Sequence, residues 1–234
     1  MNKFEEFARK PAFSLFGIVG FGITIAGCLI TALGYRGQNY PHYSMFNYFI
    51  SELGGVQTSE LAIVFNISLI IGASLMVIFL AGLIFHFTSK IGKFGCIVGV
   101  ISGIMGALVG VYPFDVNIMA HGLVAMGFFY GGMFCVIILT IRLFLEKNTP
   151  FPGILKVIGI IAAGLFILFN LSLSEFAQIF SGDAPEISED FSIDDFRPAF
   201  WPMALFEWLA TLGVLVWIFA SAIALGQINS KQKK

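Results

Sequence analysis

The chain of 234 residues is long enough for one or two soluble domains, but its composition excludes a soluble protein. Apolar residues make up 58% of the sequence and charged residues only 12%, whereas soluble domains carry about 25% charge. So little charge cannot cover the surface of a soluble globule, and the mean hydropathy of +0.90 indicates an integral membrane protein. A disordered chain, a secreted disulfide scaffold and a nucleic-acid binder are excluded on the same grounds.

Six apolar stretches are each long enough to cross a membrane as a helix. A span needs about 20 residues, because the hydrocarbon layer is about 30 Å thick and a helix rises about 1.5 Å per residue. We therefore predict an all-α, polytopic protein that forms a single membrane domain over residues 1–234. The predicted transmembrane helices cover residues 13–35, 59–87, 94–112, 120–145, 153–173 and 201–226.

The charged residues are divided unequally between the two sides of this topology. Eleven of the 13 Lys and Arg residues fall on the side that holds both termini, and only Arg36 and Arg197 fall on the other. Eleven of the 14 Asp and Glu residues lie on or towards that other side. The positive-inside rule then predicts a multi-pass protein of the cell membrane with both termini in the cytoplasm.

The first external loop carries the segment YPHYSMFNYFISELGG at residues 40–55. Its apolar residues 46, 49, 50 and 53 fall on one face of a helix, which predicts a short interfacial helix over about residues 44–53. Ser44 would cap its start, and Gly54 with Gly55 would end it. The helix would either cover the bundle as a plug or form the lid or wall of a binding site.

The third predicted span, residues 94–112, is rich in glycine. Gly95, Gly99, Gly103, Gly106 and Gly110 contain three G-x-x-x-G pairs, which allow helices to approach closely. The pattern fits tight packing within the chain, and it also fits a homo-oligomer that forms through this helix.

Polar residues gather at one depth, in the outer third of the membrane. Glu207 lies six residues into the last span, about 9 Å below its outer end. Ionisable groups at such depths are costly and are candidates for function. The candidate ligand-binding residues at this depth, or able to reach it from the first loop, are Ser51, Glu52, Asn66, Asp115, His121, Asn170 and Glu207.

Three interpretations of this layer remain open. The layer is compatible with a structural hydrogen-bond layer between helices, with a water-accessible pocket for a lipid headgroup or small solute, and with a catalytic site. In the catalytic interpretation Asp115 would orient the imidazole of His121, and Glu207 would act as general acid or base. We predict no cofactor and no metal, although a mixed site of His121, Asp115 and Glu207 is the one combination the sequence offers.

The motifs of this layer resemble those of a known family. YPHYSMFNYFISELGG at residues 40–55, YPFDVNIMAHG at 112–122 and FEWLATLGVLVW at 206–217 are similar to a six-span membrane family catalogued as a domain of unknown function, DUF998. The likeness covers roughly residues 13–226 and implies that Ser51, Glu52, Asp115, His121 and Glu207 form one external site.

A fainter resemblance is to the DRAM/FRAG-type six-span proteins. It is carried chiefly by the Ser51-Glu52-x-Gly54 element, where that group tends to have Ser-Asp. Its members are linked with lipid remodelling and lipid organisation.

The leading functional prediction is non-enzymatic binding of a lipid or amphiphile at an outer-leaflet polar pocket, with membrane lipids as partners. One alternative is a membrane-embedded hydrolase or lipid-modifying enzyme that uses His121 with Asp115 and Glu207. The other is a small-solute transporter or channel, which the few polar residues in the inner halves of the spans disfavour.

Overall fold

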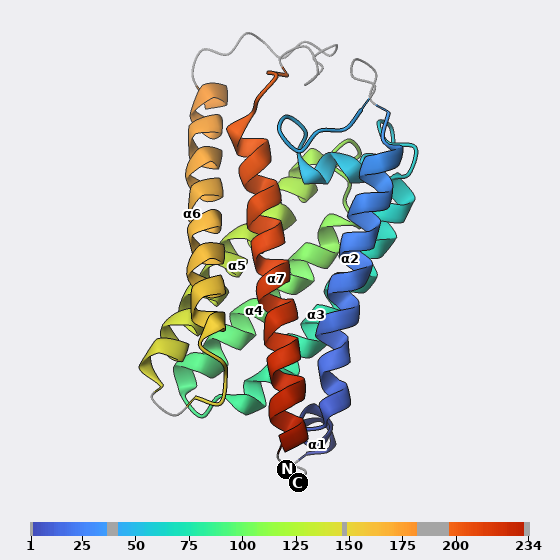
Figure 1. Cartoon of the computed structure of the whole chain (residues 1–234). Coiled ribbons are helices and arrows are strands. Elements are labelled where there is room, and N and C mark those ends of the chain that lie inside the picture. Colours follow the sequence, from blue (N-terminus) through green and yellow to red (C-terminus); the bar gives the residue numbers. More distant parts are fainter. Residues whose placement is uncertain (1, 37–41, 147–148, 182–196, 232–234) are drawn as a thin grey trace.

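The helices of the protein form an elongated bundle (Figure 1). The computed structural model describes residues 2–36, 42–146, 149–181 and 197–231. The long helices are α2 (Leu15–Gly34), α3 (Ala62–Leu83), α4 (Lys90–Val109), α5 (Ile118–Leu145), α6 (Ile154–Ser181) and α7 (Pro202–Lys231). Each of them packs against the next in chain order, and α7 also packs against α2. The described residues contain no β-strand, as the all-α prediction requires.

Six of these helical stretches are long and apolar enough to cross a membrane, which confirms a multi-pass membrane protein. The spans are Pro11–Gly34, Ala62–His86, Lys90–Val109, Ile118–Leu145, Ile154–Leu173 and Pro202–Lys231. They lie within a few residues of the predicted ranges. The predicted and observed ends differ by up to five residues. Local capping, which hydropathy does not report, sets several of these ends.

Local capping explains several of these ends. The Ser89 side chain accepts a hydrogen bond from the Gly92 N–H at 3.0 Å, so α4 begins four residues earlier than predicted. Asn117 caps α5 in the same way, because its side chain accepts from the Ala120 N–H at 3.0 Å. Pro202 occupies the first turn of α7, where its missing N–H is not needed.

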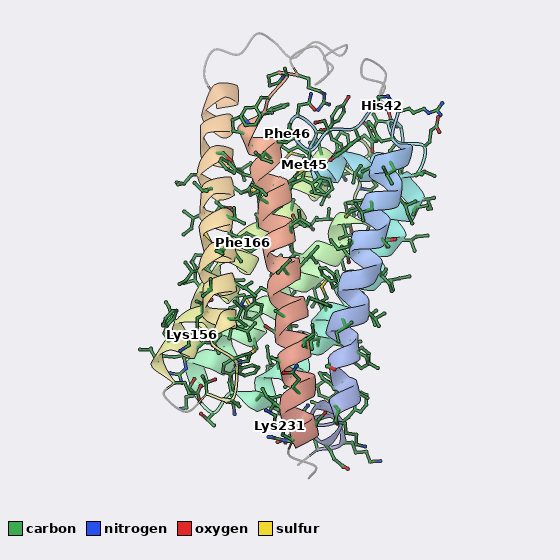
Figure 2. All side chains as sticks on the ribbon, viewed as in Figure 1. His42, Met45, Phe46, Lys156, Phe166 and Lys231 are labelled. Carbon is green, nitrogen blue, oxygen red and sulfur yellow. The ribbon has the colours of Figure 1, made fainter. Side chains whose placement is uncertain are left out.

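Both chain termini lie at the same end of the bundle (Figure 1). We call this the terminal end and the opposite one the distal end. The labelled Lys156 and Lys231 lie in the terminal half, whereas Met45 and Phe46 lie at the distal end (Figure 2). This arrangement agrees with an even number of spans, while the cytoplasmic placement of the termini stays a prediction.

The short helix α1 (Lys3–Ala8) and the 3₁₀ helix η1 (Pro11–Ser14) close the terminal end. Asn229 is 1% exposed, and its amide donates to the Ala8 carbonyl at 3.2 Å and to the Lys10 carbonyl at 3.3 Å. Arg9 donates to the Phe85 carbonyl at 3.1 Å. These bonds attach the N-terminal residues to α7 and to the 3₁₀ helix η3 (Ile84–His86), which follows α3.

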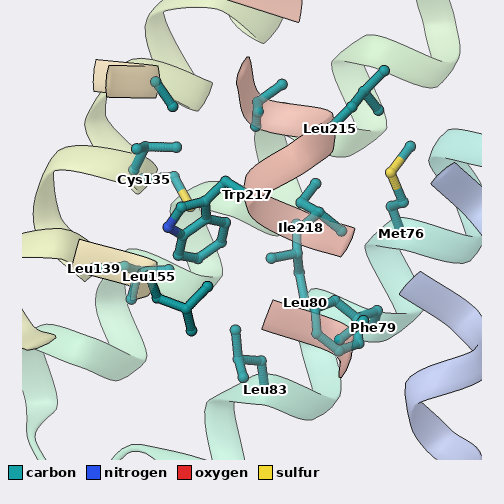
Figure 3. Packing of buried hydrophobic residues seen from close by; sticks show 14 of the residues in the cluster. Met76, Phe79, Leu80, Leu83, Cys135, Leu139, Leu155, Leu215, Trp217 and Ile218 are labelled. Atoms are coloured by element: carbon teal, nitrogen blue, oxygen red, sulfur yellow. The ribbon is translucent and has the colours of Figure 1, made fainter. Parts of the chain in front are cut away.

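The interior of the terminal half is an apolar core. Trp217 and Ile218 of α7 lie between Cys135, Leu139 and Leu155 on one side and residues of α3 on the other (Figure 3). The membrane-facing surface is apolar too, which is how a bundle in lipid differs from a soluble one.

The glycines of α4 are used for packing inside the chain. A Cβ atom at Gly99 would lie 2.6 Å from the Cys135 sulfur, and one at Gly103 would lie 2.7 Å from the Val77 side chain. Gly95, Gly106 and Gly110 likewise face α5 or α3. This supports the interpretation as internal packing, and a homo-oligomer through α4 stays a prediction.

Candidate functional site

The segment at residues 43–55, which we call the capping segment, closes the distal end of the bundle. The interfacial α-helix predicted over 44–53 is absent: the structure has a turn at 45–47 and the 3₁₀ helix η2 (Ile50–Gly54). The segment is buried rather than laid on the surface, because Tyr48 is 1% and Leu53 0% exposed. Phe46 alone of the predicted apolar face stays exposed.

The predicted helix does not form because other groups take the backbone atoms that it would need. The Phe49 N–H donates to Glu52 Oε1 and the Ile50 N–H to Glu207 Oε2, each at 2.7 Å. The Phe46 carbonyl accepts from the Trp201 N–H at 2.7 Å. The side chain of Ser44, the predicted cap, accepts from the Phe46 N–H, two residues away, at 3.3 Å.

A buried ion pair joins the capping segment to Arg197, which lies shortly before the start of α7. Arg197 donates to the two carboxylate oxygens of Glu52 at 2.6 and 3.1 Å, and to the Asn47 carbonyl at 2.6 Å. Its guanidinium carbon lies 3.8 Å from the centre of the Tyr48 ring, a cation–π contact. The side chains of Arg197 and Glu52 are 1% and 5% exposed, so this pair is shielded from water.

Tyr43 supports the same segment through its hydroxyl group. The hydroxyl donates to the Phe49 carbonyl at 2.7 Å and accepts from Trp208 Nε1 at 2.8 Å. Burial raises the pKa of the Tyr43 hydroxyl well above its usual value, so the group stays protonated and keeps donating. Trp208 belongs to α7, which gives this helix a further contact with the capping segment.

Glu207 is a buried acid on α7 and contacts the capping segment from the side of the bundle interior. It is 6% exposed, and besides the Ile50 N–H it is approached by the backbone and hydroxyl of Ser51. Thr211 lies one turn further along α7 and is 7% exposed. Its hydroxyl has no hydrogen-bond partner among the described residues.

Asn66 and Asp115 hold neighbouring parts of the loop. The Asn66 amide donates to the Gly54 carbonyl at 2.9 Å, and a Cβ atom at Gly54 would collide with the Asn66 side chain. The partly exposed Asp115 accepts from the Val56 N–H at 3.2 Å and from the Gln57 N–H at 2.7 Å. Both side chains hold the loop in place through hydrogen bonds to its backbone.

His121 does not form the predicted pair with Asp115. Its Nδ1 lies 2.8 Å from the Tyr112 carbonyl oxygen, while the Asp115 carboxylate is engaged by the loop at residues 56–57. His121 is 7% exposed and lies beside the Phe114 ring. The Asp–His arrangement of the catalytic interpretation is therefore not present among the described hydrogen bonds.

Asn170 is separated from the other candidates. Its amide donates to the Phe166 carbonyl, one turn back on α6, at 2.8 Å. A weaker contact of 3.7 Å joins it to the Met133 sulfur. It binds within its own helix and to α5, and it does not line the cavity described next.

A narrow cavity of about 90 Å³ runs through the middle of the bundle. Its distal end is lined by Ser51 of the capping segment, His121, and Glu207 with Thr211. Its walls are mostly apolar and come from α2, α3, α4, α5 and α7. Representative wall residues are Phe65, Met76 and Leu80 on α3, Phe129 and Val136 on α5, and Ile218 on α7.

The cavity is long relative to its volume. On α3 it reaches from Phe65 to Leu80, which is about 22 Å along the helix at about 1.5 Å per residue. This exceeds the thickness of half a hydrocarbon layer, about 15 Å. No Lys or Arg is among the residues that line it.

The structure thus divides the seven predicted site residues into groups. Ser51, His121 and Glu207 meet at the cavity, whereas Glu52, Asn66 and Asp115 shape the loop above it and Asn170 lies apart. No group of three or more His, Cys, Asp or Glu residues in the described part of the chain is placed to hold a metal ion. The mixed His121, Asp115 and Glu207 site therefore has no support in the geometry.

Sequence reasoning missed Arg197, Tyr43 and Trp208 as members of this region. Arg197 was visible only as one of two basic residues on the acidic side of the topology. The rarity of bases on this side of the topology is the signal that could have marked Arg197. Nothing in the spacing indicated that Tyr43 and Trp208 would share a hydrogen bond.

Comparisons with known proteins bear on the family. No curated protein and no solved structure shows significant similarity to the chain. The fainter resemblance to the DRAM/FRAG type has no support here and stays a prediction. A family model described as "Protein of unknown function (DUF998)" matches residues 18–224, and so covers all six spans in whole or in large part. The chain therefore belongs to the DUF998 family of membrane proteins.

Proposed function

We propose that this protein binds a single-chain lipid or similar amphiphile in the central cavity of its helix bundle. The observation that carries the proposal is the cavity itself, which is apolar along its walls and polar at one end. Glu207, Ser51 and His121 supply the polar end, and the 3₁₀ helix of the capping segment closes it. An amphiphile has the same division into polar head and apolar chain.

The dimensions favour one slender chain over a compact solute. An engineered cavity of about 150 Å³ takes up a benzene ring, and the cavity here is smaller. Its lining extends about 22 Å along α3, which matches the length of an unbranched hydrocarbon chain, and the small volume means that the helices must move apart to admit even one such chain. A phospholipid with two chains would need considerable widening between α3, α5 and α7.

The alternatives have less support. A hydrolase of the predicted kind needs His121 to contact a carboxylate, but Asp115 binds the loop and His121 binds a carbonyl. A channel for polar solutes needs polar groups along its path, yet the cavity walls towards the terminal end are apolar.

The proposal includes a location and an orientation. We place the protein in the cell membrane with both termini in the cytoplasm, because the basic residues collect at the terminal end. The polar end of the cavity then lies in the outer leaflet. A bound amphiphile would have its head near the outer face and its chain directed towards the membrane centre.

A cavity-filling variant tests the proposal. Ala73 lines the cavity, so Ala73→Leu occupies part of its volume, whereas Ala26 is exposed on α2 and Ala26→Leu serves as the matched control. Trp217 also lines the cavity and is 2% exposed, so a bromine-labelled hydrocarbon chain inside it quenches Trp217 fluorescence at contact range.

We expect chain-brominated amphiphiles to quench the purified protein and the Ala26→Leu variant equally, and Ala73→Leu much less. The Trp217→Phe variant identifies the part of the signal that comes from the cavity. Equal quenching of Ala73→Leu and Ala26→Leu would show that the chains bind elsewhere.

A further inference from the structure

We infer that the amphiphile bound in this cavity carries an uncharged hydroxyl head group, as a long-chain alcohol or a monoacylglycerol does. This inference rests on the proposed function and adds the chemical class of the ligand. The hydrogen-bonding groups at the distal end of the cavity decide which head group fits there.

The first such group is His121, which presents an acceptor. Its Nδ1 lies 2.8 Å from the Tyr112 carbonyl oxygen, and because a carbonyl can only accept, Nδ1 carries the proton. The neutral ring then has its lone pair on Nε2. Since His121 lines the cavity, a neutral ring in this tautomer would offer a ligand an acceptor at Nε2.

The second group is Thr211, which offers both a donor and an acceptor. It is 93% buried, lines the cavity, and its hydroxyl has no partner among the described residues. A buried hydroxyl without a partner is costly, and a ligand group that both donates and accepts removes that cost. Glu207, one turn away on the same helix, adds carboxyl oxygens to the acceptors.

Charged heads fit this set of groups poorly. No Lys or Arg lines the cavity, and Arg197 is already bound to Glu52 and Asn47, so a phosphate or carboxylate would be buried with no cation beside it. An ammonium head could donate to Glu207 and His121 but could not accept from Thr211. Burying its charge would also cost more than burying a hydroxyl.

A hydroxyl head can bond to the donors and acceptors at the distal end of the cavity. Its O–H donates to Glu207 or His121, and its oxygen accepts from Thr211. A methyl ether of the same chain keeps the accepting oxygen but has no proton to donate. The alcohol and its ether therefore differ by one hydrogen bond and make a matched pair of ligands.

The test is competition against the chain-brominated probe that quenches Trp217. The competitors share one saturated chain and are hexadecanol, its methyl ether, hexadecylamine and palmitate. We expect hexadecanol to displace the probe at about tenfold lower concentration than the ether, the ratio that one hydrogen bond of ordinary net strength gives. Hexadecylamine and palmitate should compete less well than hexadecanol.

Variants of Thr211 locate the effect. Thr211→Val is nearly isosteric and should weaken binding of hexadecanol and of the ether, because both oxygens accept from the threonine hydroxyl. Thr211→Ser should restore both. Binding of hexadecane, which has no polar head, should be the same in all three proteins, whereas a merely structural role of Thr211 would change it too.

The outcomes separate the two proposals. Failure of every competitor and of the probe itself to reach Trp217 would overturn the proposed function and this inference with it. Binding in the cavity with equal affinity for all heads, or with tighter binding of the amine, the carboxylate or the ether, would overturn the hydroxyl assignment and leave the proposed function standing.

Discussion

Loss of one partner from the Glu52–Arg197 pair should destabilise the protein much more than loss of a surface charge. Glu52→Gln keeps the size of the side chain and its acceptor for the Phe49 N–H. It leaves the positive charge of Arg197 buried, with the Asn47 carbonyl and the Tyr48 ring as neutral contacts. Arg197 is 1% exposed at its side chain, so water cannot replace the lost carboxylate.

The expected magnitude follows from that burial. Removing one partner of a buried ion pair costs about 3–5 kcal/mol. Glutamine still accepts one hydrogen bond from Arg197, so we expect Glu52→Gln to lie at the lower end, about 3 kcal/mol. Arg197→Met loses both the pair and the cation–π contact with Tyr48, worth about 0.5–2 kcal/mol, and should cost about 4 kcal/mol.

The assay is the free energy of unfolding, measured by loss of helical circular dichroism as SDS is added to mixed micelles. Glu5→Gln is the matched control, because the Arg9–Glu5 pair is 38% and 24% exposed and should be worth less than about 1 kcal/mol. The double variant should cost about 2 kcal/mol less than the sum of the single ones, since the partners interact directly. Additive costs, or a Glu52→Gln effect no larger than that of Glu5→Gln, would refute the reasoning.

Three further predictions concern packing, the loop and the topology. Gly99→Ala should cost about 1–3 kcal/mol in the same unfolding assay because its Cβ meets Cys135, whereas Gly22→Ala meets no atom within 4 Å and should be neutral or slightly stabilising. Asp115→Ala should lower the free energy of unfolding by about 1–3 kcal/mol and leave quenching of Trp217 by the brominated probe unchanged, because the residue holds the loop and does not line the cavity. In intact cells, a membrane-impermeant maleimide should label Glu60→Cys but not Ser230→Cys, and the reverse pattern would contradict the proposed orientation. The three native cysteines are buried, so they should add little background labelling.

The number and order of the helices could be predicted from the sequence because hydropathy acts over whole spans. A stretch of about 20 apolar residues has few other stable conformations in lipid, where backbone groups must bond within the segment. The capping segment lacks that constraint. Its apolar residues follow a helical period, but side chains distant in the sequence, Glu207 and Arg197 among them, take its backbone atoms instead.

The sequence predicts how deep in the membrane each candidate residue lies, but not which neighbouring helix or loop its side chain faces. Counting residues at about 1.5 Å each places Glu207, His121 and Asn170 in one layer, and the structure keeps the first two there at the cavity. Depth does not say which neighbour a helix face meets. Asn170 turns back onto the Phe166 carbonyl and Asp115 turns to the loop, so neither reaches the cavity. Helix rotation is set by close contacts such as those of the α4 glycines, and these are properties of pairs of helices that a single sequence does not reveal.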